Sequence, residues 1–141
     1  MNAKAFLKMC RYELAELASL RERQAFLRGT LLPAGLKPKA VDVQTSGNTD
    51  KMSKVVPEIV ELDKAIDAQL ERIRDRQIEA ERLIGTVDDG RYRALLRWYY
   101  LHYPPLSWAQ VADEMGYAES HILRMHGEAL KKVKMIVNDS K

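Results

Sequence analysis

The sequence predicts an all-α protein in which a long two-helix coiled-coil hairpin is followed by a C-terminal helix-turn-helix. Of the 141 residues, 46% are apolar and 30% are charged, a balance that favours a buried core over disorder. Seven glycines and five prolines are too few for a loop-rich β protein. Apolar residues recur at three- and four-residue steps, which is typical of helices. We expect two parts, the hairpin over residues 1–87 and the helix-turn-helix over residues 88–141.

The single cysteine and the charged N-terminal residues exclude several classes of protein. Cys10 is the only cysteine, so neither an intramolecular disulfide nor a multi-cysteine zinc site is possible. The first twenty residues carry charges throughout, and no apolar run approaches the roughly 18 residues that a membrane span needs. We therefore expect a reduced, cytoplasmic protein that is neither secreted nor inserted into a membrane.

The first helix is expected over residues 3–28. Its apolar face consists of Leu7, Cys10, Leu14, Leu17 and Leu20, at three- and four-residue spacing. Gly29 ends the pattern, and residues 29–52, which are rich in Pro, Gly, Ser and Thr, are interpreted as a loop. Because an unstructured connection of this length is unusual, we expect it to be mobile or held by a partner.

A second helix is expected from Ser53 to Val87, with Pro57 in its opening turn, where the missing N–H has no intrahelical acceptor. Its stripe consists of Ile59, Leu62, Ile66, Leu70, Ile73, Gln77, Ala80, Ile84 and Val87. These eight steps cover 28 residues and average 3.5, the period of a coiled-coil seam. Gln77, its one polar member, is either a register or partner selector or a solvated position at the end of the seam.

The charges of the two hairpin segments are complementary. Residues 1–40 carry eight positive and three negative side chains, and residues 41–87 carry seven and ten. Opposite net charge favours pairing of the two helices, though weakly, since exposed ion pairs contribute about 0–1 kcal/mol each. Two helices alone bury little core, so we expect the hairpin to pair with a second copy, with the C-terminal part or with another protein.

A third helix is expected over residues 88–103, with Thr86 and Asp89 resembling a capping box at its start. One of its sides carries Tyr92, Leu95, Leu96, Tyr99 and Tyr103, and Pro104 ends it. The aromatic residues of this region lie at helical spacing, which favours packing in the core over stacking on nucleobases.

The next residues meet the requirements of a helix-turn-helix together. The predicted elements are a helix over residues 108–115, a turn at Gly116 and a last helix over residues 119–137. Ser107 is placed to cap the first of these helices, and Gly116 stands where a left-handed residue is needed. Ala112 is small where the two helices would cross, and Ile122 falls on the inner side of the last helix.

Two known families resemble this part of the chain. The runs Ser107–Tyr117, His121–Met125 and Ala129–Val133 resemble region four of bacterial sigma factors, the helix-turn-helix that reads a promoter element. Residues 53–137 resemble, in order, phage regulators of the ArpU type, notably at Asp89, Tyr92, Arg93, Leu95 and Leu96 and at His126, Gly127, Ala129 and Leu130. The resemblance implies a phage-type transcription regulator in a bacterial host cell. It would bind double-stranded DNA as a homo-oligomer formed through the coiled coil, or together with host RNA polymerase.

The sigma-factor resemblance also implies which side chains contact DNA. By position, Glu119, Ser120, Leu123 and Arg124 correspond to the family's base-contacting residues. Arg124 would donate to guanine, Glu119 would accept from cytosine and Leu123 would contact a thymine methyl group. The phosphate contacts would come from Ser107, Lys131, Lys132 and Lys134. For the lysines, a solvated helix face is an equally good interpretation.

No residue pattern predicts catalysis. His102, His121 and His126 are the only histidines, and the last two fall on different helix faces, so we expect no metal site. Neither a phosphate-binding loop nor a nucleophile elbow is present, and we expect no cofactor and no enzymatic activity. The alternative to a DNA-binding regulator is a non-enzymatic phage adaptor or polymerase-binding protein whose helix-turn-helix contacts protein. The weak overall basicity and Glu119 favour this alternative.

Overall fold

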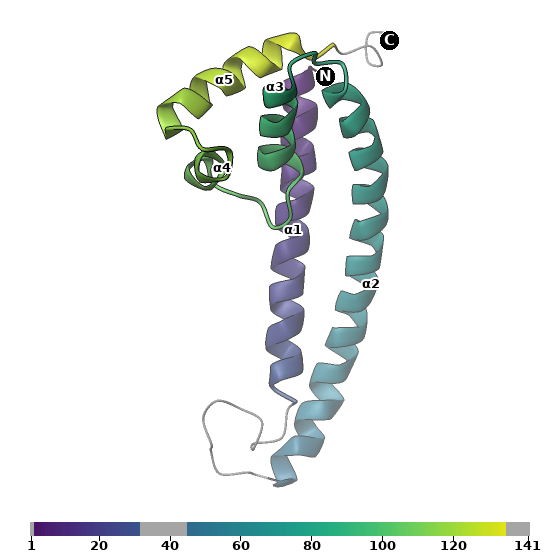
Figure 1. Cartoon of the computed structure of the whole chain (residues 1–141). Coiled ribbons are helices and arrows are strands. Elements are labelled where there is room, and N and C mark those ends of the chain that lie inside the picture. The colour runs from purple at the N-terminus through teal and green to yellow at the C-terminus, as the bar shows by residue number, and fades with distance from the viewer. Residues whose placement is uncertain (1, 32–44, 135–141) are drawn as a thin grey trace. The chain divides into compact units, whose positions relative to one another are not determined.

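The computed structural model describes residues 2–31 and 45–134 of the chain. Its elements are α1 (Ala3–Gly29), α2 (Thr45–Ile84), α3 (Gly90–Leu96), the π-helical turn η2 (Arg97–Leu101), α4 (Trp108–Met115) and α5 (Glu119–Lys132). No strand occurs in these described residues, and the predicted all-α fold is confirmed (Figure 1). Among the same residues, no helix contains an apolar stretch long enough to cross a lipid bilayer.

The chain divides into two compact units, and both long helices contribute to each of them. The first unit comprises Met1–Glu16 with Glu71–Lys141, and the second comprises Leu17–Leu70. This division differs from the predicted boundary at residue 87. The reason is that the first turns of α1 and the last turns of α2 share one hydrophobic core with α3, η2, α4 and α5.

The second unit is an antiparallel pair formed by the C-terminal part of α1 and the N-terminal part of α2 (Figure 1). Its buried apolar side chains are Leu17, Leu27, Ile59 and Ile66. Arg23 and Glu58 form an ion pair at 2.9 Å, but both side chains are about half exposed, so the pair stabilises little. Gln69 is only 1% exposed although it is polar. Gln69 is not a member of the stripe predicted for the second helix, so the sequence analysis did not predict that its side chain is buried.

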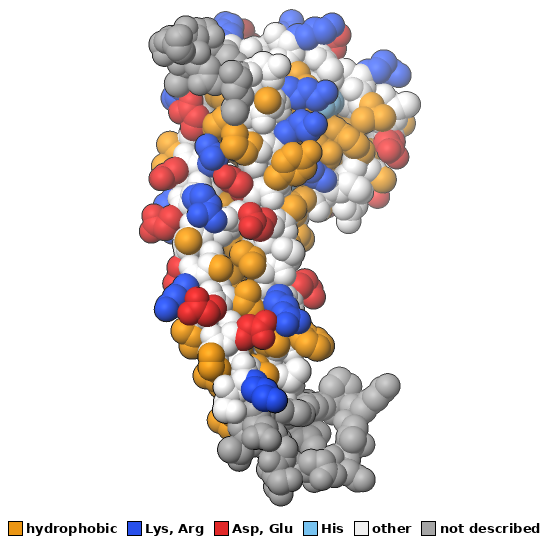
Figure 2. All heavy atoms as spheres, turned by 180° about the vertical axis from the view of Figure 1, so that it is seen from behind, with side chains coloured by type: hydrophobic (Ala, Val, Ile, Leu, Met, Phe, Trp, Pro, Cys, Tyr) orange, Lys and Arg blue, Asp and Glu red, His pale blue; other side chains and the backbone are white. Residues whose placement is uncertain are grey.

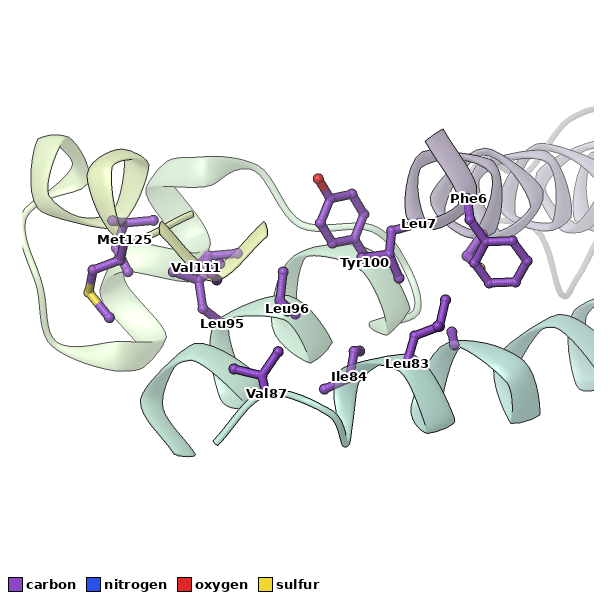
Figure 3. Packing of buried hydrophobic residues seen from close by; sticks show 14 of the residues in the cluster. Phe6, Leu7, Leu83, Ile84, Val87, Leu95, Leu96, Tyr100, Val111 and Met125 are labelled. Atoms are coloured by element: carbon purple, nitrogen blue, oxygen red, sulfur yellow. The ribbon is translucent and has the colours of Figure 1, made fainter. Parts of the chain in front are cut away.

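The first unit is organised around one core to which every one of its helices contributes. The buried residues are Phe6, Leu7, Cys10, Ala80, Leu83, Ile84, Val87, Leu95, Leu96, Tyr100, Val111, Ala112, Ile122, Met125 and Ala129. Figure 3 shows the labelled members of this cluster converging from α1, α2, α3 and the helix-turn-helix. The core explains how a short C-terminal part becomes stable, since a small isolated unit buries too little apolar surface.

The start of α2 differs from the sequence prediction. The helix begins at Thr45, eight residues before Ser53, so the end of the predicted loop over residues 29–52 is helical. Residues 32–44 of that loop lie outside the described part. Pro57 is therefore inside α2 and not in its opening turn. Proline at an interior position lacks the N–H of one intrahelical bond, and the rest of this 40-residue helix accommodates that loss.

The predicted capping box of the third helix is also wrong. Asp89 alone is the N-cap of α3, and its carboxylate accepts a hydrogen bond from the backbone N–H of Arg91 at 2.8 Å. The hydroxyl of Thr86 instead donates to the carbonyl of Leu83 at 2.6 Å, so it closes the end of α2. The side-chain hydrogen bond from Arg91, together with its backbone N–H, holds the pKa of Asp89 below its usual range.

The helix predicted over residues 88–103 changes its winding part-way. From Arg97 it continues as the π-helical turn η2, whose wider turn rotates the following side chains relative to an α-helix. As a result Tyr100 is buried at 1% exposure, whereas Tyr103, predicted to face the core, is 37% exposed. The carbonyl of Tyr99 accepts a hydrogen bond from Arg11 at 2.6 Å, and that of Leu101 accepts a long one from Gln77 at 3.5 Å.

The last helix is shorter than predicted. α5 ends at Lys132, and Val133 is extended, with φ −73° and ψ 133°. The backbone N–H of Lys134 donates to the hydroxyl of Thr86 at 2.9 Å. This bond takes residues 133–134 away from a helical path, because the same N–H would otherwise bond within the helix. Residues 135–137 of the predicted helix lie outside the described part.

Candidate functional site

The candidate site is built on α4, the turn at Gly116 and α5. Ser107 caps α4 as predicted: its hydroxyl accepts from the N–H of Gln110 at 3.2 Å, and the Gln110 side chain accepts from the N–H of Ser107 at 2.8 Å. The two bonds form a reciprocal capping box, so the first turn of α4 has a fixed starting point. The observed bounds of α4, Trp108–Met115, agree with the predicted ones.

The turn between the two helices depends on Gly116. Its φ of 77° and ψ of 30° lie in the left-handed region, which disfavours residues with a Cβ atom. The N–H groups of Gly116 and Tyr117 both bond to the carbonyl of Ala112, at 2.9 and 3.0 Å. These bonds satisfy the end of α4 and direct the chain toward α5.

The two helices meet through small and apolar side chains. Val111 and Ile122 are fully buried, and Ala112 is 3% exposed. Met125 and Ala129 continue the buried side of α5. The predicted inner positions of the helix-turn-helix therefore lie in the core that also holds α1 and α3.

The opposite side of α5 carries the residues that the sequence assigns to base contacts. Glu119, Ser120, Leu123 and Arg124 are all exposed. Leu123 is 45% exposed, whereas its neighbour Ile122 is fully buried, because successive residues of a helix point in different directions. α5 begins after Ala118, which has no side chain able to cap it, and its first N–H groups receive no side-chain bond from that residue. The first turn of α5 is thus an open surface with mixed polar and apolar character.

The predicted phosphate-contacting residues lie at the two ends of the helix-turn-helix. Ser107 is exposed at the start of α4, while Lys131 and Lys132 are exposed in the last turn of α5. Lys131 forms only a surface ion pair with Glu128, with the charged atoms 3.7 Å apart. Lys134 is exposed beyond the end of α5. Lys131, Lys132 and Lys134 are neighbours in the sequence at the end of α5, whereas Glu119 begins the same helix, so these groups stand at opposite ends of α5.

Aromatic side chains from η2, α4 and α5 pack against one another at the helix-turn-helix. The rings of Tyr99 and Trp108 stack at 3.6 Å, and the ring of His126 lies 4.6 Å from that of Trp108. The guanidinium of Arg11, on α1, lies 3.8 Å above the ring of Tyr99. The predicted packing role of the aromatic residues at positions 99, 100 and 108 is confirmed. The sequence does not identify Arg11 as their partner, because 88 residues separate it from Tyr99.

A hydrogen bond joins the π-helical turn to the middle of α5. The hydroxyl of Tyr100 and Nε2 of His126 lie 2.6 Å apart. Burial raises the pKa of the Tyr100 hydroxyl. Burial, followed by the nearby positive charge of Lys4, lowers the pKa of His126 to about 4. Both side chains are therefore neutral at pH 7, and the pair holds α5 in place without a charge.

The family model that matches this chain covers residues 36–134, which is more than half of the 141 residues. Its description is "Protein of unknown function (DUF1492)". The chain belongs to the DUF1492 family. The match includes all of the residues of α4, the turn at Gly116 and α5.

A comparison with curated proteins finds no significant match to this DUF1492 protein, and a comparison with solved structures finds none either. Within the part of the chain that the structure describes, no three His, Cys, Asp or Glu side chains lie close enough to hold a metal ion.

Proposed function

We propose that this protein is a phage-type transcription regulator that binds duplex DNA through α4 and α5. One observation carries the proposal: α5 buries Ile122 and Met125 and leaves Glu119, Ser120 and Arg124 exposed at its start. A helix held in this way, by a shorter neighbour across a glycine turn, is the arrangement that helix-turn-helix proteins insert into the major groove. The resemblance to sigma-factor region four and to ArpU-type regulators supports the same function.

In this proposal the first turns of α5 read the base edges. The guanidinium of Arg124 donates two hydrogen bonds to guanine, and the carboxylate of Glu119 accepts one from the amino group of cytosine. Leu123 contacts a thymine methyl group, and this contact explains why an apolar side chain is exposed at this position. Ser120 donates to whichever base edge its neighbours bring within reach. The neutral Tyr100–His126 pair keeps α5 at a fixed position during these contacts.

Phosphate contacts from Ser107, Lys131, Lys132 and Lys134 would set the register of the protein on the duplex. A net charge of +3 provides few such contacts, and salt weakens each of them, so one copy alone binds weakly. A homo-oligomer formed through the coiled-coil hairpin, or an association with host RNA polymerase, would supply the missing affinity. Both partners are part of the proposal, as is the cytoplasm of a bacterial host cell as its location.

Selection of bound sequences from a pool of random duplexes tests this function. We expect a recurrent motif, with an affinity for it that falls as salt rises. Arg124→Ala should cost roughly 1–3 kcal/mol of binding free energy and relax one base position, whereas Lys131→Ala should weaken binding to all sequences about equally. If wild-type protein selects no motif and both variants bind random duplex as the wild type does, the groove assignment is wrong.

A protein-binding role for the same surface is the second candidate. Asp113 and Glu114 are exposed at the end of α4, and Glu119 is exposed just after the turn. Three carboxylates near the surface that would enter the groove oppose the phosphate charge. A non-enzymatic phage adaptor or polymerase-binding protein would not have this difficulty. Binding to purified host RNA polymerase without any affinity for duplex DNA, at low or high salt, would favour this second function.

A further inference from the structure

The first turns of α1 carry opposite charges on their two flanks. Around the buried residues Leu7 and Cys10, one flank bears Lys4, Lys8 and Arg11, at four- and three-residue steps. The other flank bears Glu13, whose carboxylate accepts from Arg76 of α2 at 2.9 Å. The acidic flank of α1 is thus turned toward α2, and the basic flank is turned away from it.

Arg11 of the basic flank contacts residues that pack against the helix-turn-helix. Arg11 lies 3.8 Å above the ring of Tyr99 and donates to its carbonyl, and Tyr99 stacks on Trp108 at the start of α4. Lys4 and Lys8 follow Arg11 on the same flank toward the N-terminus, and the charge of Lys4 reaches His126 in the middle of α5. Figure 2 shows Lys and Arg side chains beside a histidine in the upper part of the view.

Lys4 and Lys8 occupy positions that do not favour helix stability. Lys4 lies in the first turn of α1, near the positive end of the helix dipole, and no acidic residue occupies that turn. Lys4 and Lys8 are four residues apart, a spacing at which like charges repel. Both are exposed, and neither forms an ion pair with a carboxylate among the described residues. A positive surface that costs the free protein stability is suited to an anionic partner.

We propose that Lys4 and Lys8 form a second phosphate-contacting surface beside α5, so that α1 extends the DNA interface beyond the helix-turn-helix. This inference rests on the proposed function and identifies residues that the sequence analysis did not assign to it. The ligand is the sugar-phosphate backbone of the same duplex that α5 reads. Since α1 is fixed by Arg11 and by the shared core, the two lysines approach the duplex at a constant distance from the base-reading end of α5.

The proposed contact predicts how steeply the affinity for duplex DNA falls as the salt concentration rises. Each phosphate that a lysine neutralises contributes about 0.9 to the slope of log affinity against log salt concentration. The double variant Lys4→Gln with Lys8→Gln should therefore reduce the magnitude of the slope by about 2. At 0.1 M salt its affinity should fall roughly tenfold to a hundredfold. The loss should be equal for selected and random duplexes, because phosphates carry no sequence information.

Three companion variants make the experiment specific, and all are measured in the full-length chain. Lys54→Gln with Lys64→Gln removes the same charge from exposed positions of the other compact unit and should leave the slope unchanged. Lys4→Arg with Lys8→Arg keeps the charge and should keep the slope. Lys4→Gln alone should raise the pKa of His126, measured by NMR titration without DNA, because it removes a nearby positive charge.

The outcomes separate this inference from the function on which it rests. If wild-type protein binds no duplex and shows no salt slope, the proposed function fails. If wild-type protein binds duplex and the Lys4 and Lys8 double variant keeps the wild-type slope, only the α1 contact is wrong. An equal loss of slope in the Lys54 and Lys64 control would also overturn it, since net charge and not position would then be responsible. Circular dichroism of each variant establishes that α1 remains folded.

Discussion

The hydroxyl of Tyr100 and the imidazole of His126 share a hydrogen bond of 2.6 Å, which ties the π-helical turn to α5. Tyr100 is almost fully buried, and the pair lies beside the stacked rings of Tyr99 and Trp108. α5 is therefore anchored at its middle by a polar contact as well as by the apolar residues on its inner side. The position of its exposed start depends on both.

Removing the hydroxyl should destabilise the protein. In Tyr100→Phe, Nε2 of the half-buried His126 loses its partner, and an unsatisfied buried polar group costs about 1–3 kcal/mol. We expect the free energy of unfolding in urea to fall by that amount. Tyr12→Phe is the matched control, since Tyr12 is 63% exposed and should tolerate the same change. Equal effects of the two substitutions would show that the Tyr100–His126 bond contributes nothing.

The lowered pKa of His126 predicts a loss of stability in mild acid. Its pKa is about 4 in the folded protein and about 6.5 when unfolded, so only the unfolded chain takes up the proton between these values. Stability contributed by the neutral ring is complete above pH 6.5 and is lost as the pH falls toward 4, by up to about 3 kcal/mol. Urea unfolding at a series of pH values measures this loss. In His126→Gln the dependence between pH 6.5 and 5 should be much flatter, and an unchanged dependence would assign the loss to other groups.

The same substitution at two glycines should have opposite effects. Gly116→Ala forces an alanine into the left-handed region at φ 77°, which costs about 1–2 kcal/mol even though no atom obstructs the new methyl group. Gly127 lies inside α5 with open space around its Cβ position, so Gly127→Ala should stabilise the protein by about 0.5–1 kcal/mol. Urea midpoints measure both changes. Two shifts of the same sign would contradict the assigned turn.

Cys10 should report on the docking of α1. Its thiol is 1% exposed, and burial, with a further contribution from Glu13, raises its pKa to about 12. At pH 8 the native protein should react with an aromatic disulfide reagent more than about a hundredfold more slowly than the unfolded chain, because little thiolate forms and the sulfur is covered. Reaction in concentrated guanidinium gives the reference rate. A native rate close to that reference would mean that α1 does not stay in the core.

Local signals were sufficient to predict α4, its cap and its turn. The Ser107 cap and the left-handed Gly116 follow from interactions between residues at most four apart. Such interactions can be predicted from the types of residue that are close in the sequence. The helix-period stripe likewise predicted α1 within one residue of its observed end at Gly29, whereas the stripe of α2 was predicted to run three residues beyond its observed end at Ile84. Thr86 shows the limit of this approach. Its hydroxyl lies between the end of α2 and the start of α3 and could cap either helix, and the sequence pattern does not indicate which of the two it caps.

The amino-acid sequence by itself determined the helices, the glycine turn and which side of α5 is apolar, because these depend on local propensity and periodicity. The tertiary structure decided that Tyr103 is exposed while Tyr100 bonds to His126, that α5 stops where Lys134 bonds to Thr86, and that Arg11 lies over the ring of Tyr99. Each of these depends on partners 26 to 88 residues away, as the bonds of Tyr100 and Arg11 show. No local pattern encodes such pairings, since they are selected only when the whole core is packed.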